Sequence, residues 1–168
     1  MTRLLVVYYS WTGSTAKVAE AIAGELSADV EEIREVRRRA GPFAFIRAAL
    51  QSMRETPAAI MPSVRDVADY DVVILGCPVW AQNMASPMRS YILREGSKFR
   101  QVAFFCTLGG AGGDAALAKM AALTGRPPVA RLLVTAAPLK SGGWRDLVKA
   151  FARQISASPS PTRRDHAA

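Results

Sequence analysis

Short apolar runs recur along the chain and alternate with segments whose apolar residues repeat at helical spacing. Most of the runs are unbroken by polar residues and rich in β-branched or aromatic ones, which is typical of strands buried on both faces. The predicted strands are residues 3–9, 30–36, 71–77, 102–107 and 131–136, of which the second is charged and typical of a sheet edge. The predicted helices are residues 14–26, 43–53, 84–93, 114–123 and 144–155. This alternation predicts an α/β fold, a parallel sheet with helices on both faces.

The length of the chain favours a single domain. It has 168 residues, of which 50% are hydrophobic and 21% charged, enough apolar surface for one core. We expect a folded domain over residues 1–156. The remaining residues 157–168 are rich in Ser, Pro and Arg, which predicts a disordered tail.

The chain is basic, with 22 Lys and Arg against 14 Asp and Glu and a formal net charge of +8. This favours anionic partners. A group of arginines around the second predicted helix raises the alternative of nucleic-acid binding: Arg34, Arg37, Arg38, Arg39, Arg47 and Arg54. No aromatic residues interleave with them as stacking platforms, so we expect a solvated face and no nucleic-acid partner. Arg37 to Arg39 could equally meet an acidic redox partner or the 2′-phosphate of NADPH.

The apolar runs are too short for a membrane span, which needs roughly 18 to 20 residues. The N-terminal run is not followed by a small-residue cleavage site. The two cysteines, Cys77 and Cys106, do not make a disulfide framework. We therefore expect a cytoplasmic protein with reduced thiols.

The single histidine limits the chemistry that the chain can perform. His166 lies in the predicted tail, so the predicted domain has no imidazole. This argues against Ser-His-Asp and Cys-His triads, His-based zinc sites and His general bases. We expect no metal site.

The loops after the first, third and fourth strands carry the candidate site, because ligands of open parallel sheets bind outside the carboxyl ends of the strands. The first loop contains hydroxyls and the start of a helix: Ser10, Trp11, Thr12, Gly13, Ser14 and Thr15. Free N–H groups at a helix start favour a phosphate. The alternative is an ordinary hydroxyl-rich helix cap.

The second loop, residues 77–84, contains Trp80, whose face could stack on a planar ring while Gln82 and Asn83 reach the ring's polar edge. The alternative is a Trp packed on the rim of the domain. The third loop, residues 107–113, is glycine-rich enough for a ligand to approach its backbone, or is a plain flexible turn. Its match to the dinucleotide fingerprint is weak, because it follows a late strand and lacks the acidic residue that would bind a ribose.

Taken together, the segments YYSWTGST, DVVILGCPVW and FFCTLGGAGG resemble the flavodoxin-like FMN proteins over roughly residues 3 to 155. The resemblance implies a three-layer sandwich around a five-stranded parallel sheet of order 2-1-3-4-5, with FMN as cofactor. The first-loop residues, Ser10 to Thr15, would bind its phosphate through hydroxyls and backbone amides. The residues that would surround its ring are Pro78, Val79, Trp80, Gln82, Asn83, Thr107, Leu108, Gly109 and Gly110. No side chain need act as a catalytic group, because the redox chemistry belongs to the flavin.

Two departures from the small electron carriers favour an NAD(P)H-dependent reductase of a quinone or similar acceptor. The carriers are typically acidic, whereas here the three loops contain no Asp or Glu before Asp114, so we expect a less negative reduction potential. The carriers also often have a glycine beside the ring, where a peptide can flip. Here Ala81 follows Trp80. The second loop is instead similar to that of FMN quinone reductases related to the tryptophan-repressor-binding flavoproteins.

Two alternatives to a reductase stay open. One is a one-electron carrier that docks on a redox partner protein. The other is a non-redox regulatory domain, although receiver domains of the same architecture need clustered acidic residues where Tyr8, Tyr9 and Ser10 stand here. A homodimer is compatible with any of these functions. We expect Cys77 and Cys106 to be near one another, as small buried hydrophobes or, less favoured, as a redox pair.

Overall fold

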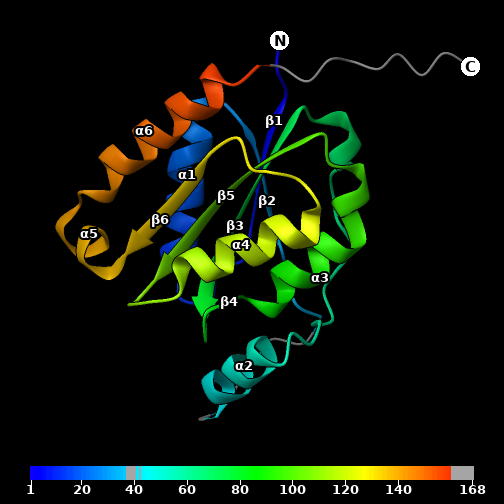
Figure 1. Ribbon diagram of the computed structural model, residues 1–168, viewed down its shortest axis with the longest axis vertical. Helices are drawn as coiled ribbons and strands as arrows, with labels where there is room; N and C mark the ends of the chain where they lie inside the picture. The colour runs from blue at the N-terminus through cyan, green and yellow to red at the C-terminus, as the bar shows by residue number, and fades with distance from the viewer. Residues whose placement is uncertain (37–40, 42, 160–168) are drawn as a thin grey trace, which may run out of the picture.

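The computed structural model describes residues 1–36, 41 and 43–159 (Figure 1). Its strands are β1 (Leu4–Tyr8), β2 (Asp29–Glu32), β3 (Val72–Trp80), β4 (Asn83–Met84), β5 (Gln101–Leu108) and β6 (Arg131–Thr135). Its α-helices are α1 (Ser14–Leu26), α2 (Ala44–Met53), α3 (Ser86–Glu95), α4 (Gly113–Thr124), α5 (Ala136–Ser141) and α6 (Trp144–Ala157). Two 3-10 turns, η1 (Val67–Asp69) and η2 (Gly96–Lys98), precede β3 and β5. Each predicted strand and helix has a counterpart here, and α1 has the predicted bounds.

The long strands form one parallel sheet in the order β2-β1-β3-β5-β6. Counted without the short β4, this is the expected order 2-1-3-4-5, so the α/β flavodoxin-like fold is confirmed. β2 forms one edge, in agreement with its charged sequence. The strand order reverses at β1, so the carboxyl ends of β1 and β3 lie side by side.

Helices cover both faces of the sheet and make three layers (Figure 1). β3 shows why, because its residues are buried on both sides: Val73 and Leu75 belong to the core that includes α3 and α4, whereas Val72 and Ile74 belong to the core that includes α1 and α6. Gly76 is required on this strand. A Cβ there would lie 1.9 Å from the ring of Phe105, which fills that space.

The prediction of a loop over residues 77–84 is wrong. β3 continues to Trp80, and the chain then turns back as the antiparallel β4, with Val79 opposite Met84 and Trp80 opposite Asn83. The turn residues are Ala81 and Gln82, which lack the Asn-Gly signature of a two-residue hairpin. For the same reason α3 begins at Ser86 rather than at residue 84. The short helix α5 was not predicted either.

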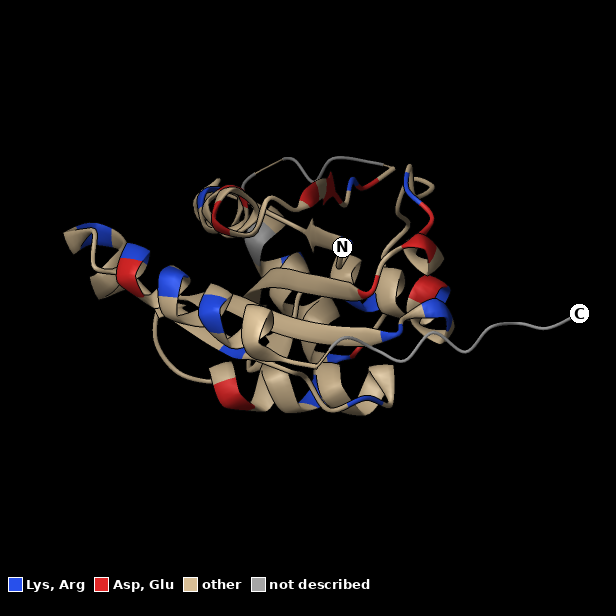
Figure 2. Ribbon diagram, turned by 90° about the horizontal axis from the view of Figure 1, so that it is seen from above, with Lys and Arg blue, Asp and Glu red and all other residues tan. Residues whose placement is uncertain are grey.

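Some residues discussed in the sequence analysis fall outside the part of the chain that the structure describes. Arg37 to Arg39 and His166 lie outside the described residues. Most of the predicted tail does too, although α6 extends to Ala157 and thus into its first position. Within the described residues, no helix has the length and apolar character needed to cross a membrane. Among the residues that the structure describes, Lys and Arg are spread around the molecule among acidic residues rather than gathered on one face (Figure 2).

Candidate cofactor site

The loop between β1 and α1 is held in shape by Ser10 and Gly13. The backbone N–H groups of Gly13 and Ala16 donate hydrogen bonds to Ser10 Oγ, at 3.1 and 3.2 Å. Gly13 precedes the helix with φ of +93°, a conformation that favours glycine, and open space lies where its Cβ would be. The alternative interpretation of this loop as a helix cap therefore also applies, with the Ser10 hydroxyl as the capping group from outside the helix.

The first turn of α1 has backbone N–H groups available for a ligand. Ser14 and Thr15 are its first two residues, and such N–H groups have no partner inside a helix. Thr12 is exposed and Ser14 is half-buried, so their hydroxyls are accessible too. In contrast, Thr15 is buried, and its hydroxyl forms a hydrogen bond with another side chain of the protein. The helix start and the accessible Thr12 and Ser14 hydroxyls lie where the sequence predicts an anion cradle; that any of them binds an anion stays a prediction.

The Thr15 hydroxyl joins the first loop to the third. Thr15 Oγ1 lies 2.7 Å from Thr107 Oγ1 near the end of β5, and both side chains are buried. This hydrogen bond fixes the start of α1 against the carboxyl end of β5, across the intervening strand β3.

An aromatic cluster joins the first loop to the second. The Trp80 ring meets the rings of Tyr9 and Trp11 edge to face, with centroids 5.8 and 5.4 Å apart. Trp80 is only 7% exposed, whereas Trp11 is half-buried. Trp80 is thus a packed member of the core as well as a candidate for stacking, and Trp11 is the more accessible ring.

The β3–β4 hairpin contributes the other second-loop residues. Pro78 and Val79 are half-buried at the end of β3, and Gln82 is exposed in the turn. Asn83 is buried, and its Oδ1 has no hydrogen-bond partner among the described residues. A buried polar atom without a partner is costly, so Asn83 is suited to a ligand that supplies a donor.

The third loop touches the hairpin through a glycine that the sequence analysis did not select. Gly112 has φ of +96°, and a Cβ on it would lie 2.8 Å from Gln82 Cα. Leu108 is buried at the end of β5, while Gly109 and Gly110 are exposed beside open space. The first loop, the β3–β4 hairpin that replaces the predicted second loop, and the third loop therefore form one rim, joined by the pairs Thr15–Thr107, Trp11–Trp80 and Gln82–Gly112.

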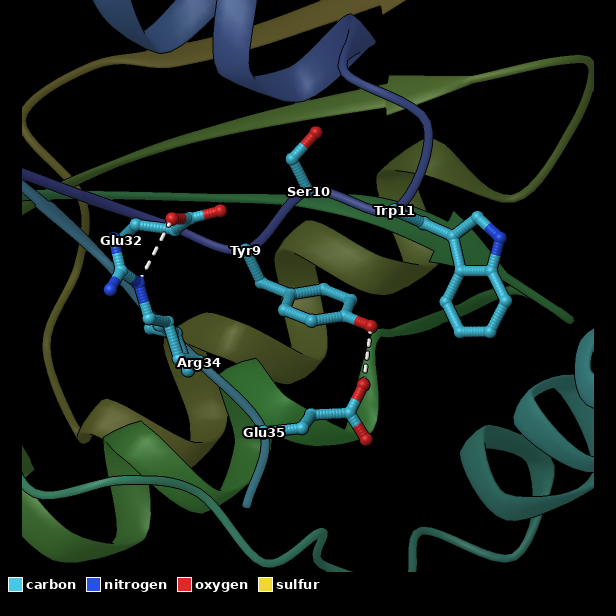
Figure 3. Close-up of a pocket in the computed structure, with 7 residues that line it drawn as sticks. Tyr9, Ser10, Trp11, Glu32, Arg34 and Glu35 are labelled. Carbon is cyan, nitrogen blue, oxygen red and sulfur yellow. Dashed lines mark hydrogen bonds and ion pairs between the residues drawn. The ribbon is translucent and has the colours of Figure 1, made fainter. Parts of the chain in front are cut away.

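A cavity of about 490 Å³ adjoins the first loop on the side of β2 (Figure 3). It is lined by Tyr9, Ser10, Trp11, Glu32, Ile33, Arg34 and Glu35. The Tyr9 hydroxyl donates a hydrogen bond to Glu35, and Arg34 Nε lies 3.2 Å from Glu32 Oε2. Ser10 and Trp11 belong to the predicted first loop, whereas the residues at the end of β2 and after it were not predicted as part of the site: Glu32, Ile33, Arg34 and Glu35. The predicted position of the second strand beside the first could have identified them.

This cavity changes the electrostatic argument made from the sequence. The three loops contain no acidic residue before Asp114, but the end of β2 brings Glu32 and Glu35 to the first loop. Arg34 offsets part of this negative charge. The site is therefore less uniformly positive than the sequence of its loops suggests.

Cys77 and Cys106 are neighbours, as predicted. They lie opposite one another in the register of β3 and β5, and both are fully buried and unbridged. Hydrogen bonding with Cys77, together with burial, raises the pKa of Cys106 well above its usual range. Cys106 is therefore a protonated, enclosed thiol.

A family model of flavodoxins matches residues 3–124, which is more than half of the chain. The chain belongs to the flavodoxin family. The match contains all three loops of the rim and ends at the last residue of α4. It thus confirms the resemblance that the loop sequences indicate.

Solved structures show the same flavodoxin-like fold. A flavoprotein from Lactobacillus acidophilus, solved in complex with FMN, is 23% identical with a TM-score of 0.70, covering 84% of this chain and 98% of that one. A flavoprotein from Bacteroides uniformis, described as putative, is 19% identical with a TM-score of 0.73, covering 90% and 98%. Flavodoxin 2 from Bacillus cereus is 16% identical with a TM-score of 0.59, covering 92% and 98%.

Proposed function

We propose that this flavodoxin-family chain binds FMN on the rim at the carboxyl ends of β1, β3 and β5. The observation that carries the proposal is the joining of the three loops, above all by the buried Thr15–Thr107 hydrogen bond. The similar flavoprotein from Lactobacillus acidophilus was solved with FMN, which supports the choice of ligand.

The first loop fits the phosphate group. The N–H groups of Ser14 and Thr15 and the positive end of the α1 dipole favour an anion. Ser10 Oγ accepts two N–H bonds, which leaves its own proton free for a phosphate oxygen. The Thr12 and Ser14 hydroxyls add accessible donors.

The second and third loops fit the ring. Trp11, Pro78, Val79 and Trp80 offer apolar contact, and the orphan Oδ1 of Asn83 can accept a hydrogen bond from a ring N–H. Gly109 and Gly110 have no side chains that would block the opposite face of the ring. The same residues would exclude water from part of the ring, which strengthens the polar contacts that remain.

We further propose that the chain catalyses two-electron reduction of a quinone or similar acceptor with NAD(P)H. FMN, when bound, supplies the redox chemistry. The support is the hairpin turn, where Ala81 and Gln82 have φ of +48° and +61°. Reversing the peptide between them would place Ala81 at ψ of about −120° with positive φ, a conformation that requires glycine. The backbone switch that favours one-electron carriers is therefore hindered here.

Transfer of single electrons to a partner protein is the second candidate. It is favoured by the family match and by Glu32 and Glu35 beside the first loop, whose negative charge would lower the reduction potential. For either function we propose a cytoplasmic location, which the two unbridged, adjacent thiols support.

The test is the visible spectrum of the full chain titrated with FMN and then reduced stepwise without oxygen. We expect a perturbed, bound spectrum, reduction in a single two-electron stage, and turnover with NADH or NADPH and a soluble quinone. Accumulation of a one-electron stage without such turnover would favour the carrier. An unperturbed FMN spectrum would refute the site.

Variants connect the binding to the first loop. Ser10→Ala should weaken FMN roughly tenfold, the size expected for losing one hydrogen bond to a charged group, and should affect riboflavin, which lacks the phosphate, much less. Ser97→Ala, an exposed position in η2 at the amino end of β5, is the matched control. Equal losses for FMN and riboflavin would place the phosphate elsewhere.

A further inference from the structure

Among the side chains of helix α2 that the structure describes, the small ones face the protein and the large apolar ones face solvent. Ala44, Ala48 and Ser52 are buried. The four large side chains on the other side are 44% to 67% exposed and form what we call the α2 apolar face: Phe43, Ile46, Leu50 and Met53. Their spacing of three and four residues places them on one stripe. A helix that served only the core of this domain would have the opposite orientation.

Polar contacts fix this orientation. Ser52 Oγ lies 3.4 Å from Ser86 Oγ at the start of α3. Just after the helix, Glu55 pairs with Lys119 of α4 at 3.1 Å and with Arg89 of α3 at 3.6 Å. The inner side of α2 is thus matched to its neighbours, and the side chains of the α2 apolar face are exposed.

Arginines border the α2 apolar face. Arg47 and Arg54 are both exposed, and their separation of seven residues puts them on the same flank of the helix, next to Phe43 and Leu50. An apolar stripe with a cationic border is the pattern of helices that lie in the interface of an anionic bilayer.

We propose that the α2 apolar face docks on an anionic lipid surface, with its large side chains among the acyl chains and its arginines at the headgroup phosphates. A second copy of this chain fits the face less well. An antiparallel two-fold contact through α2 would place Arg47 and Arg54 of one copy on the same side as those of the other. Four side chains of one short helix would also bury much less surface area than the roughly 800 Å² per partner of a stable interface.

The position of α2 gives this docking a purpose, one that rests on the proposed function. α2 packs beside β3 and β4, the strands of the hairpin that carries Trp80 and Asn83 (Figure 1). A chain held on a bilayer through α2 would have its candidate site near the lipid. Apolar quinones dissolve in that phase, so docking would bring the site to its acceptor.

Cosedimentation of the full chain with vesicles tests the proposal. We expect binding to phosphatidylglycerol–phosphatidylcholine vesicles, weaker binding to phosphatidylcholine alone, and release as salt is raised. The double variant Ile46→Ser with Leu50→Ser keeps the charge and should lower the partition roughly tenfold or more. Leu147→Ser on α6, 38% exposed, is the matched control and should bind like the wild type.

Three results would overturn the proposal: no binding to anionic vesicles, binding that the double variant retains, or equal loss in the Leu147 control. A wild-type dimer that the double variant converts to monomers, seen by light scattering, would instead assign the face to a second copy. FMN titration of the same samples separates the two proposals. Vesicle binding without FMN binding would refute the cofactor site alone, and FMN binding without vesicle binding would refute the docking alone.

Discussion

Thr15 and Thr107 are 92 residues apart in the sequence, and their hydroxyl oxygens form a buried hydrogen bond of 2.7 Å. Each hydroxyl is the partner of the other at the junction of two loops. The pair therefore sets the spacing between the helix start that would bind a phosphate and the loop that would shield a ring.

Removing one member of this pair should cost more than removing both. Thr107→Val leaves the Thr15 hydroxyl buried without a partner, so we expect a loss of about 1–3 kcal/mol in the free energy of unfolding and weaker FMN binding. The double variant Thr15→Val with Thr107→Val should recover much of the stability. Urea denaturation measures both, and strictly additive losses would show that the hydroxyls do not interact.

Gly112→Ala should disturb the contact between the third loop and the hairpin. The positive φ alone costs about 1–2 kcal/mol, and the new Cβ would also press against Gln82 Cα. Gly125→Ala is the control, because Gly125 has φ of +63° beside open space and carries only the backbone cost. Gly112→Ala should be the less stable variant and alone should weaken FMN binding. If the two variants had equal effects on stability and on FMN binding, the Gly112–Gln82 contact would contribute to neither.

Ala81→Gly tests the role of the hairpin turn in redox behaviour. Glycine at this position allows the Ala81–Gln82 peptide to reverse, so we expect a one-electron stage to accumulate that the wild type does not show. Stepwise anaerobic reduction of both proteins with bound FMN measures this. Identical reduction profiles would mean that the turn does not control the number of electrons transferred.

Cys106 should make stability depend on pH above neutrality. Its pKa is raised in the folded protein by hydrogen bonding with Cys77 and by burial. The unfolded thiol loses its proton near pH 8.5, whereas the folded one keeps it, so the folded state binds more protons above that pH. The contribution of Cys106 to stability is fully present below about pH 8.5 and is lost as the pH rises toward the pKa of Cys106 in the folded state.

Urea denaturation between pH 7 and 10 measures this slope. Cys106→Ala should be less stable at every pH because it leaves a cavity, but its stability should fall less steeply. The thiols of the native wild type should also react slowly with a labelling reagent. If the unfolding free energies of the two proteins fell equally steeply with pH, or if the thiols were labelled rapidly, the pH dependence could not be assigned to a buried Cys106.

Local sequence determined the strands of the parallel sheet and the helices between them, but not β4 or α5. The unbroken apolar runs predict the strands, because a strand buried on both faces cannot carry polar residues. The spacing from Val18 to Leu26 predicts α1 at its observed bounds. The loop motifs predict where the candidate site lies, because the carboxyl ends of parallel strands share one edge of the sheet.

Only the tertiary structure decided how these parts meet. Trp80-Ala81-Gln82-Asn83 carries no hairpin signature, and the turn forms because β4 can pair with β3 and pack beside α4. The pairing of Thr15 with Thr107 and the approach of Glu35 to Tyr9 join residues far apart in the chain. The outward orientation of Ile46 and Leu50 on α2 follows from the neighbours that receive Ala48 and Ser52. Such contacts depend on shape and burial across elements, which periodicity within one segment does not encode.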